Sequence, residues 1–158
     1  MKKWILIIFP LIILIISASL YVYIDARAPL LKAEQYAEQR AKTEAHLVSN
    51  DEFFVYHGTK TYYVIKGKNE KGTETIVWIP EESKKDIIIK KASDGISEKD
   101  AISKLIQEEN PKKILGARLG MEKNLPIWEL SYLDQNSKLN YYYIHFDSGK
   151  WWRKIENL

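Results

Sequence analysis

The sequence contains no cysteine and only three histidines. Without cysteine, the chain can form no disulfide, carry no lipidated cysteine and use no thiol in catalysis or redox chemistry. The histidines, His46, His57 and His145, are far apart and belong to no H-x-x-x-H or H-E-x-x-H motif. A zinc site would therefore lack both its usual cysteine ligands and closely spaced histidines, and we expect no metal and no cofactor.

Motifs for catalysis are also absent. No serine lies in a G-x-S-x-G or S-x-x-K motif. The carboxylates of Glu81-Glu82 and Glu108-Glu109 are adjacent in sequence, so neighbouring side chains point apart and do not form a hydrolytic pair. The segment Gly116–Gly120 (GARLG) alternates as a strand does and precedes no helix, which excludes a phosphate-binding loop. We therefore predict that the protein is not an enzyme and has no small-molecule substrate.

A strong excess of one charge is missing as well. Lys2 and Lys3 provide two of the 24 Lys and Arg residues, which leaves 22 basic against 21 acidic side chains in the rest of the chain. The basic residues occur in short doublets such as Lys90-Lys91 and Lys112-Lys113, without the concentration that binding to a phosphate backbone requires. We expect no nucleic-acid partner.

One long apolar run is present. From Trp4 to Ile24, 21 residues contain no charged side chain, histidine, asparagine or glutamine, and a helix of this length extends about 31 Å, enough to span a bilayer. Lys2 and Lys3 precede it, and Asp25 and Arg27 follow, so the positive-inside bias places the N-terminus in the cytoplasm. The sequence predicts a cytoplasmic tail (1–3), a transmembrane anchor (4–24) and extracellular domains on a single-pass membrane protein.

A cleaved signal peptide is the alternative to an anchor. Ile5–Ile16 is long enough for the apolar region of a signal peptide, and Ser17–Ser19 offers small residues for cleavage. The apolar run, however, continues through Tyr21 and Tyr23, and tyrosine at the membrane interface is typical of a retained helix. Both possibilities remain open, and we favour the anchor.

The first half of the remaining chain has a helix followed by strands. Alanines and a tyrosine recur at three- and four-residue intervals over 33–47, which predicts a helix. Pro29 precedes this helix and is expected to end or bend the membrane helix. β-Branched and aromatic residues, separated by turn-forming residues, then predict antiparallel strands. We expect these strands at 53–57, 61–66, 75–79 and 86–91.

The second half repeats this plan. Ser97 with Asp100 three residues later has the spacing of a capping box, so a helix is expected to begin there and to end before Pro111. Strands are expected at 113–119, 127–133, 139–146 and 151–155, with breaks that include Gly120. The two halves align at an offset of about 65 residues. We predict an α+β fold in which the transmembrane helix precedes two small units (25–91 and 92–158), each with one helix packed on three or four antiparallel strands.

Several short segments resemble one family when their order and spacing are taken together. They are Ala28-Pro29-Leu30, 62–67 (YYVIKG), 76–79 (IVWI), Gly95-Ile96-Ser97, 119–122 (LGME), 126–129 (PIWE), 141–143 (YYY) and 146–150 (FDSGK). With the anchor, they resemble the TseB-like (YpmB-like) cell wall elongation regulators of Gram-positive bacteria. The resemblance covers essentially the whole chain and implies a tandem of cystatin-like, PepSY-related domains.

The resemblance also implies a function. It suggests a membrane-anchored extracytoplasmic regulator of peptidoglycan elongation that acts on a class B penicillin-binding protein. Fold analogy alone suggests the alternative, a cystatin-like or PepSY-type peptidase inhibitor or chaperone at the cell surface.

The aromatic content of the second half points to a protein-interaction site. Strand alternation places Tyr141, Tyr143 and His145 on the sheet face opposite to Tyr142, Ile144 and Phe146. The same alternation places Trp152 on the side opposite to Trp151, Arg153 and Ile155, where it can join the first group. Our candidate interaction residues are therefore Tyr141, Tyr143, His145 and Trp152. Such a face either binds another protein or packs on the first unit.

Overall fold

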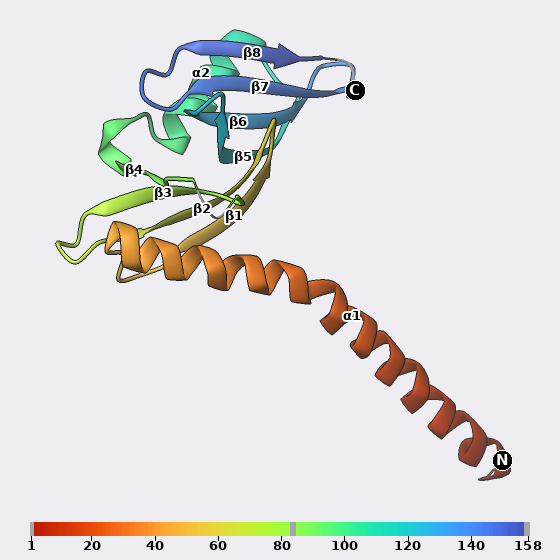
Figure 1. Cartoon of the computed structure of the whole chain (residues 1–158). Coiled ribbons are helices and arrows are strands. Elements are labelled where there is room, and N and C mark those ends of the chain that lie inside the picture. The colour runs from red at the N-terminus through yellow and green to blue at the C-terminus, as the bar shows by residue number, and fades with distance from the viewer. Residues whose placement is uncertain (1, 83–84, 157–158) are drawn as a thin grey trace. The chain divides into compact units, whose positions relative to one another are not determined.

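The computed structural model describes residues 2–82 and 85–156. It contains two long helices, one short 3-10 helix and two antiparallel sheets (Figure 1). The elements are, in order, α1 (Lys2–Ala45), β1 (Glu52–His57), β2 (Thr61–Lys68), β3 (Glu74–Pro80), β4 (Ile88–Lys91), η1 (Ala92–Asp94), α2 (Glu98–Glu109), β5 (Lys113–Glu122), β6 (Leu125–Leu133), β7 (Leu139–His145) and β8 (Trp151–Ile155).

The long helix α1 contains the apolar run. It continues through Pro10 and Pro29, so Pro29 does not end the membrane helix; that it bends the helix remains a prediction. A proline inside a helix removes one backbone hydrogen bond, and long membrane-spanning helices tolerate this loss. Its segment from Phe9 onward is long and apolar enough to cross a membrane. By its internal contacts the chain divides after Tyr36, and both sheets belong to the part from Ala37 onward.

The first sheet is covered on both faces. Its strands lie in the order β1-β2-β3-β4, all antiparallel. Most residues of β2 and β3 are buried, in runs of consecutive residues without regular alternation between buried and exposed positions, which is typical of a strand with packing on both sides. The last turns of α1 run along this sheet (Figure 1), and Ala37, Ala41 and Ala45 are buried there at four-residue intervals.

The second sheet has the order β5-β6-β7-β8, and α2 lies along it. The helix begins as predicted, because the Ser97 side chain accepts a hydrogen bond from the Asp100 backbone and Asp100 accepts one from the Ser97 backbone. The helix ends at Asn110, whose backbone adopts the left-handed conformation. Its buried residues Ala101 and Leu105 face the sheet.

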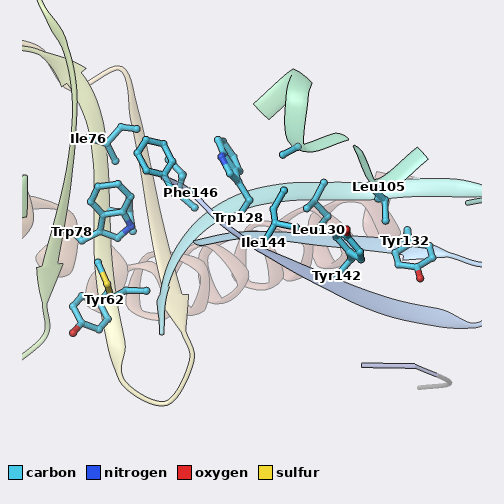
Figure 2. Close-up of a cluster of buried hydrophobic side chains, with 14 residues drawn as sticks. Tyr62, Ile76, Trp78, Leu105, Trp128, Leu130, Tyr132, Tyr142, Ile144 and Phe146 are labelled. Carbon is cyan, nitrogen blue, oxygen red and sulfur yellow. The ribbon is translucent and has the colours of Figure 1, made fainter. Parts of the chain in front are cut away.

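One hydrophobic cluster joins the two sheets. Figure 2 shows side chains that run from Ile76 and Trp78 of the first sheet, through Phe146 and Trp128, towards the α2 side of the second sheet. The rings of Trp78 and Phe146 meet edge to face at 5.6 Å between centroids. The second face of the first sheet is therefore buried by the second sheet.

A second contact between the sheets joins the end of β1 and the turn after it to the end of β5. Tyr56 of β1 packs so closely on Gly120 that a Cβ at residue 120 would lie 2.5 Å from its ring. The buried Glu122 carboxylate accepts hydrogen bonds from the Tyr56 hydroxyl at 3.1 Å and from the Thr59 hydroxyl at 2.6 Å. The predicted break at Gly120 is wrong, because β5 continues to Glu122, and the glycine serves this close approach.

The predicted fold class is confirmed: a long apolar helix precedes two four-stranded antiparallel sheets with their helices. The predicted strands all occur, with bounds that differ by a few residues at their ends. The boundaries of the two predicted units, 25–91 and 92–158, remain a prediction.

Candidate protein-interaction face

The alternation predicted for β7 is present. Tyr142 and Ile144 are fully buried with α2 in the shared cluster. Tyr141, Tyr143 and His145 point to the opposite side of the sheet. Centroid distances are 6.5 Å between Tyr141 and Tyr143, 6.0 Å between Tyr143 and Trp152, and 6.1 Å between His145 and Trp152. The structure thus brings the four candidate residues together on one face, which we call the aromatic face.

A β-bulge in β8 changes the composition of this face. Tyr143 pairs with Arg153 and Ile144 pairs with Trp151, which leaves Trp152 as an extra residue between them. Because of this extra residue, Arg153 and Ile155 lie on the same side as Trp152. The prediction that they lie on the opposite side is wrong, since strict alternation does not hold across a bulge.

The aromatic face is partly covered by the first sheet. Tyr143 is only 5 % exposed, because it packs in a small cluster with Tyr56 of β1 and Ile127 of β6. Tyr141, His145 and Trp152 are half-buried and keep part of their surface. One part of this face therefore packs within the molecule, and the other part stays accessible. Binding of another protein to the accessible part remains a prediction.

Two arginines and one carboxylate lie among the aromatic rings. Arg118 donates from Nε to Glu129 Oε1 at 2.6 Å, and Glu129 is buried. The Arg153 guanidinium lies 4.6 Å from the centroid of the Tyr143 ring and 5.0 Å from that of Trp152, within the range of a cation–π interaction.

The hydroxyl of Tyr143 is held neutral by its surroundings. Burial raises the pKa of Tyr143 to about 12; the Glu129 carboxylate adds to this rise, and the Arg153 guanidinium opposes it. At neutral pH this side chain is therefore a hydrogen-bond donor within the face and not a base.

A cavity of about 340 Å³ lies beside the rings. It is lined by Phe54 of β1, by Gly116, Ala117 and Arg118 of β5, by Glu129 and Ser131 of β6, and by Tyr141 of β7. The small residues of β5 leave room, the two aromatic side chains form apolar walls, and the Arg118–Glu129 ion pair supplies polar groups. Such a mixture is suited to receiving a side chain of a binding partner.

The three histidines lie on separate elements. His46 follows the end of α1 with a positive φ of 52°, His57 ends β1, and His145 ends β7. Within residues 2–82 and 85–156, no group of three or more His, Asp or Glu side chains is arranged to hold a metal ion. The aromatic face itself offers aromatic rings and charged groups.

Sequence reasoning missed three components of this face. Arg153 was placed on the wrong side, and neither the Arg118–Glu129 pair nor Tyr56 was identified. The Arg118–Glu129 pair could have been predicted from the pairing of β5 with β6, because these two residues face each other on neighbouring strands. The contact with Tyr56 joins residues of different sheets and has no local signal.

Comparisons with known proteins agree with one another. The family model described as "Cell wall elongation regulator TseB-like domain" matches residues 36–80. The chain is 37% identical over 141 residues to the "Probable cell wall elongation regulator TseB" of Bacillus subtilis (strain 168), which covers 89% of this chain and 86% of that protein. A solved structure of the YpmB protein from Bacillus subtilis is similar with a TM-score of 0.71 and 36% identity, over 77% of this chain and 95% of that chain. Sequence and fold thus agree over most of the chain.

Proposed function

This chain belongs to the TseB-like family of cell wall elongation regulators, and we propose that it is a membrane-anchored binding module that acts on a class B penicillin-binding protein. The family supports a role in the regulation of cell wall elongation and fits a protein that is not an enzyme. The target, the anchor and the site of contact are our proposal.

The first part of the proposal concerns the anchor. The apolar segment of α1 supports a single membrane crossing, and Lys2 and Lys3 before it favour a cytoplasmic N-terminus. Both sheets would then lie outside the cell, where peptidoglycan is assembled. An anchor in the same membrane also raises the local concentration of this chain near a membrane-bound synthase.

The observation that carries the proposal is the composition of the accessible part of the aromatic face. Tyrosine, tryptophan and arginine are the residue types that contribute most to protein–protein binding, and here they adjoin a cavity. Because Tyr143 is already buried and fixed, the half-exposed Tyr141, His145 and Trp152 are held in place before a partner arrives. Preorganisation of this kind lowers the entropic cost of binding.

Photocrosslinking in live cells tests this proposal. A photoreactive residue replaces His145 on the aromatic face in the full chain, and in a matched control it replaces the exposed Lys68 at the end of β2. Captured proteins are identified by mass spectrometry. We expect a penicillin-binding protein to be captured from position 145 and not from position 68.

Two other results would contradict the proposal. Capture of an extracellular protease from position 145 would favour the inhibitor function that fold analogy suggests. Crosslinks from position 145 that form only within the chain would show that the accessible part of the aromatic face has no partner in the cell.

A further inference from the structure

Arg153 differs from the other arginine of the aromatic face in its partners. Arg118 is neutralised by the buried Glu129. Arg153 is exposed and rests on two aromatic rings, and in the part of the chain that the structure describes no carboxylate forms an ion pair with it. The nearby carboxylate of Glu156 is paired with Lys154 at 2.7 Å.

The stacking gives Arg153 a defined role in recognition. A guanidinium that lies on aromatic rings keeps the N–H groups along its edge available, and their fixed geometry matches the two oxygens of a carboxylate. Tyr143 is itself fixed by burial, so the charge is held in position without an acidic side chain from the described part of the chain. The accessible part of the aromatic face therefore presents an unneutralised, oriented positive charge.

The cavity and this charge lie at neighbouring tyrosines of β7. Arg153 covers the Tyr143 ring, whereas Tyr141 lines the cavity. The two tyrosine rings are 6.5 Å apart. In an extended peptide, side chains on one side repeat every two residues, or roughly 6.6 Å. A carboxylate over Arg153 and an apolar side chain two positions away would therefore reach the charge and the cavity together.

We propose that the aromatic face binds an extended acidic segment of the partner protein, with a carboxylate on Arg153 and an apolar side chain in the cavity beside Tyr141. This inference rests on the proposed function above and specifies the chemistry of the partner. The carboxylate supplies the complementary charge, and the apolar side chain packs on Phe54 and Tyr141 at the walls of the cavity.

Charge reversal tests the inference in the full chain. Arg153→Glu is combined with the photoreactive residue at position 145, and Lys68→Glu, the same charge change away from the aromatic face, is the matched control. We expect Arg153→Glu to lower capture of the partner about tenfold or more, because a carboxylate would then face a like charge. Arg153→Lys, which keeps the charge but not the forked geometry, is expected to give an intermediate loss. Lys68→Glu is expected to have no effect.

A compensating change in the partner gives the decisive result. Mass spectrometry of the crosslinked peptide identifies the captured segment, and its acidic residue is changed to lysine. We expect this change to restore capture by Arg153→Glu, because the charge pair is then re-formed with its signs exchanged. Circular dichroism of purified full-length Arg153→Glu in detergent verifies that the variant is folded.

Other outcomes separate this inference from the proposed function. If Arg153→Glu leaves capture of the penicillin-binding protein unchanged, the acidic segment is excluded although the proposed function stands. If the chain with the photoreactive residue at position 145 and Arg153 unchanged captures no such protein, the proposed function and this inference both fail. If Arg153→Glu weakens only the sedimentation of the protein with purified cell walls, the arginine recognises an anionic polymer, and the inference is overturned.

Discussion

The two sheets of this protein have the same strand number and the same order of strands, but they differ in how their faces are covered. The central strands of the first sheet are buried on both sides, by the end of α1 and by the shared hydrophobic cluster. The second sheet is covered on one side by α2. On its other side Tyr56 of the first sheet packs on Tyr143, whereas Tyr141, Trp152 and Ile155 are only partly buried. The uncovered part of the second sheet is the surface that we propose for contact with a partner.

The largest expected effect concerns the shared cluster. Trp78 is fully buried between the sheets, so Trp78→Ala is expected to lower the free energy of unfolding by about 3–5 kcal/mol. Trp151→Ala is the matched control, since Trp151 is 55% exposed and its loss is expected to cost about 0.5 kcal/mol or less. Urea unfolding of the full chain in detergent, followed by circular dichroism, measures both. Equal costs would show that the cluster does not hold the two sheets together.

A smaller effect is expected from two glycines of β5, of which Gly120 contacts Tyr56 of the first sheet and Gly116 does not. A Cβ at residue 120 would collide with the Tyr56 ring, whereas a Cβ at residue 116 would meet only the Ser131 hydroxyl at 3.7 Å. Gly120→Ala is therefore expected to destabilise the protein by about 1–3 kcal/mol through overpacking. Gly116→Ala is expected to be neutral or slightly stabilising, because alanine loses less backbone entropy than glycine. The same unfolding measurement compares them, and a reversed order would contradict the packing of Tyr56 on β5.

This pair of glycines also illustrates what the sequence could and could not predict. The strands, the start of α2 at Ser97 and the alternation of β7 follow from local patterns of side chains, and all of them are present. Gly120 resembles a strand break in sequence, yet its role depends on Tyr56, which is 64 residues away. Local patterns contain no information on such a contact.

The aromatic face shows the same limit. Tyr141, Tyr143, His145 and Trp152 could be grouped from alternation, and the structure places their rings side by side. Arg153 could not, since a bulge adds one residue and reverses the alternation after it. How deeply Tyr143 is buried also depended on the first sheet. The position of Arg153 on the aromatic face could therefore be established only from the structure.

A third prediction separates binding from stability on the second sheet. Trp152 is half-buried on the aromatic face, so Trp152→Ala is expected to cost about 1 kcal/mol of stability. Capture of the partner by Trp152→Ala is expected to fall about tenfold, because aromatic anchors at an interface contribute strongly to binding. Trp151→Ala, one residue away and on the other side of the sheet, serves as the control. If both variants lower capture equally, the partner does not distinguish the two faces.

The smallest expected effect concerns the cap of α2, the helix that covers the other face of the second sheet. Hydrogen bonds from Ser97 hold the pKa of Asp100 below its usual value. A carboxyl group with a lowered pKa stabilises the folded state above its unfolded pKa of about 3.9, and this stabilisation is lost as the pH falls through the lower folded pKa. Asp100→Asn is therefore expected to be less stable than the unmodified chain at pH 7, and the difference is expected to shrink at pH 3. Urea unfolding at both pH values measures it, with Glu98→Gln, which leaves the capping box intact, as the control. A difference that stays constant with pH would show that the charge of Asp100 does not support the helix that covers this sheet.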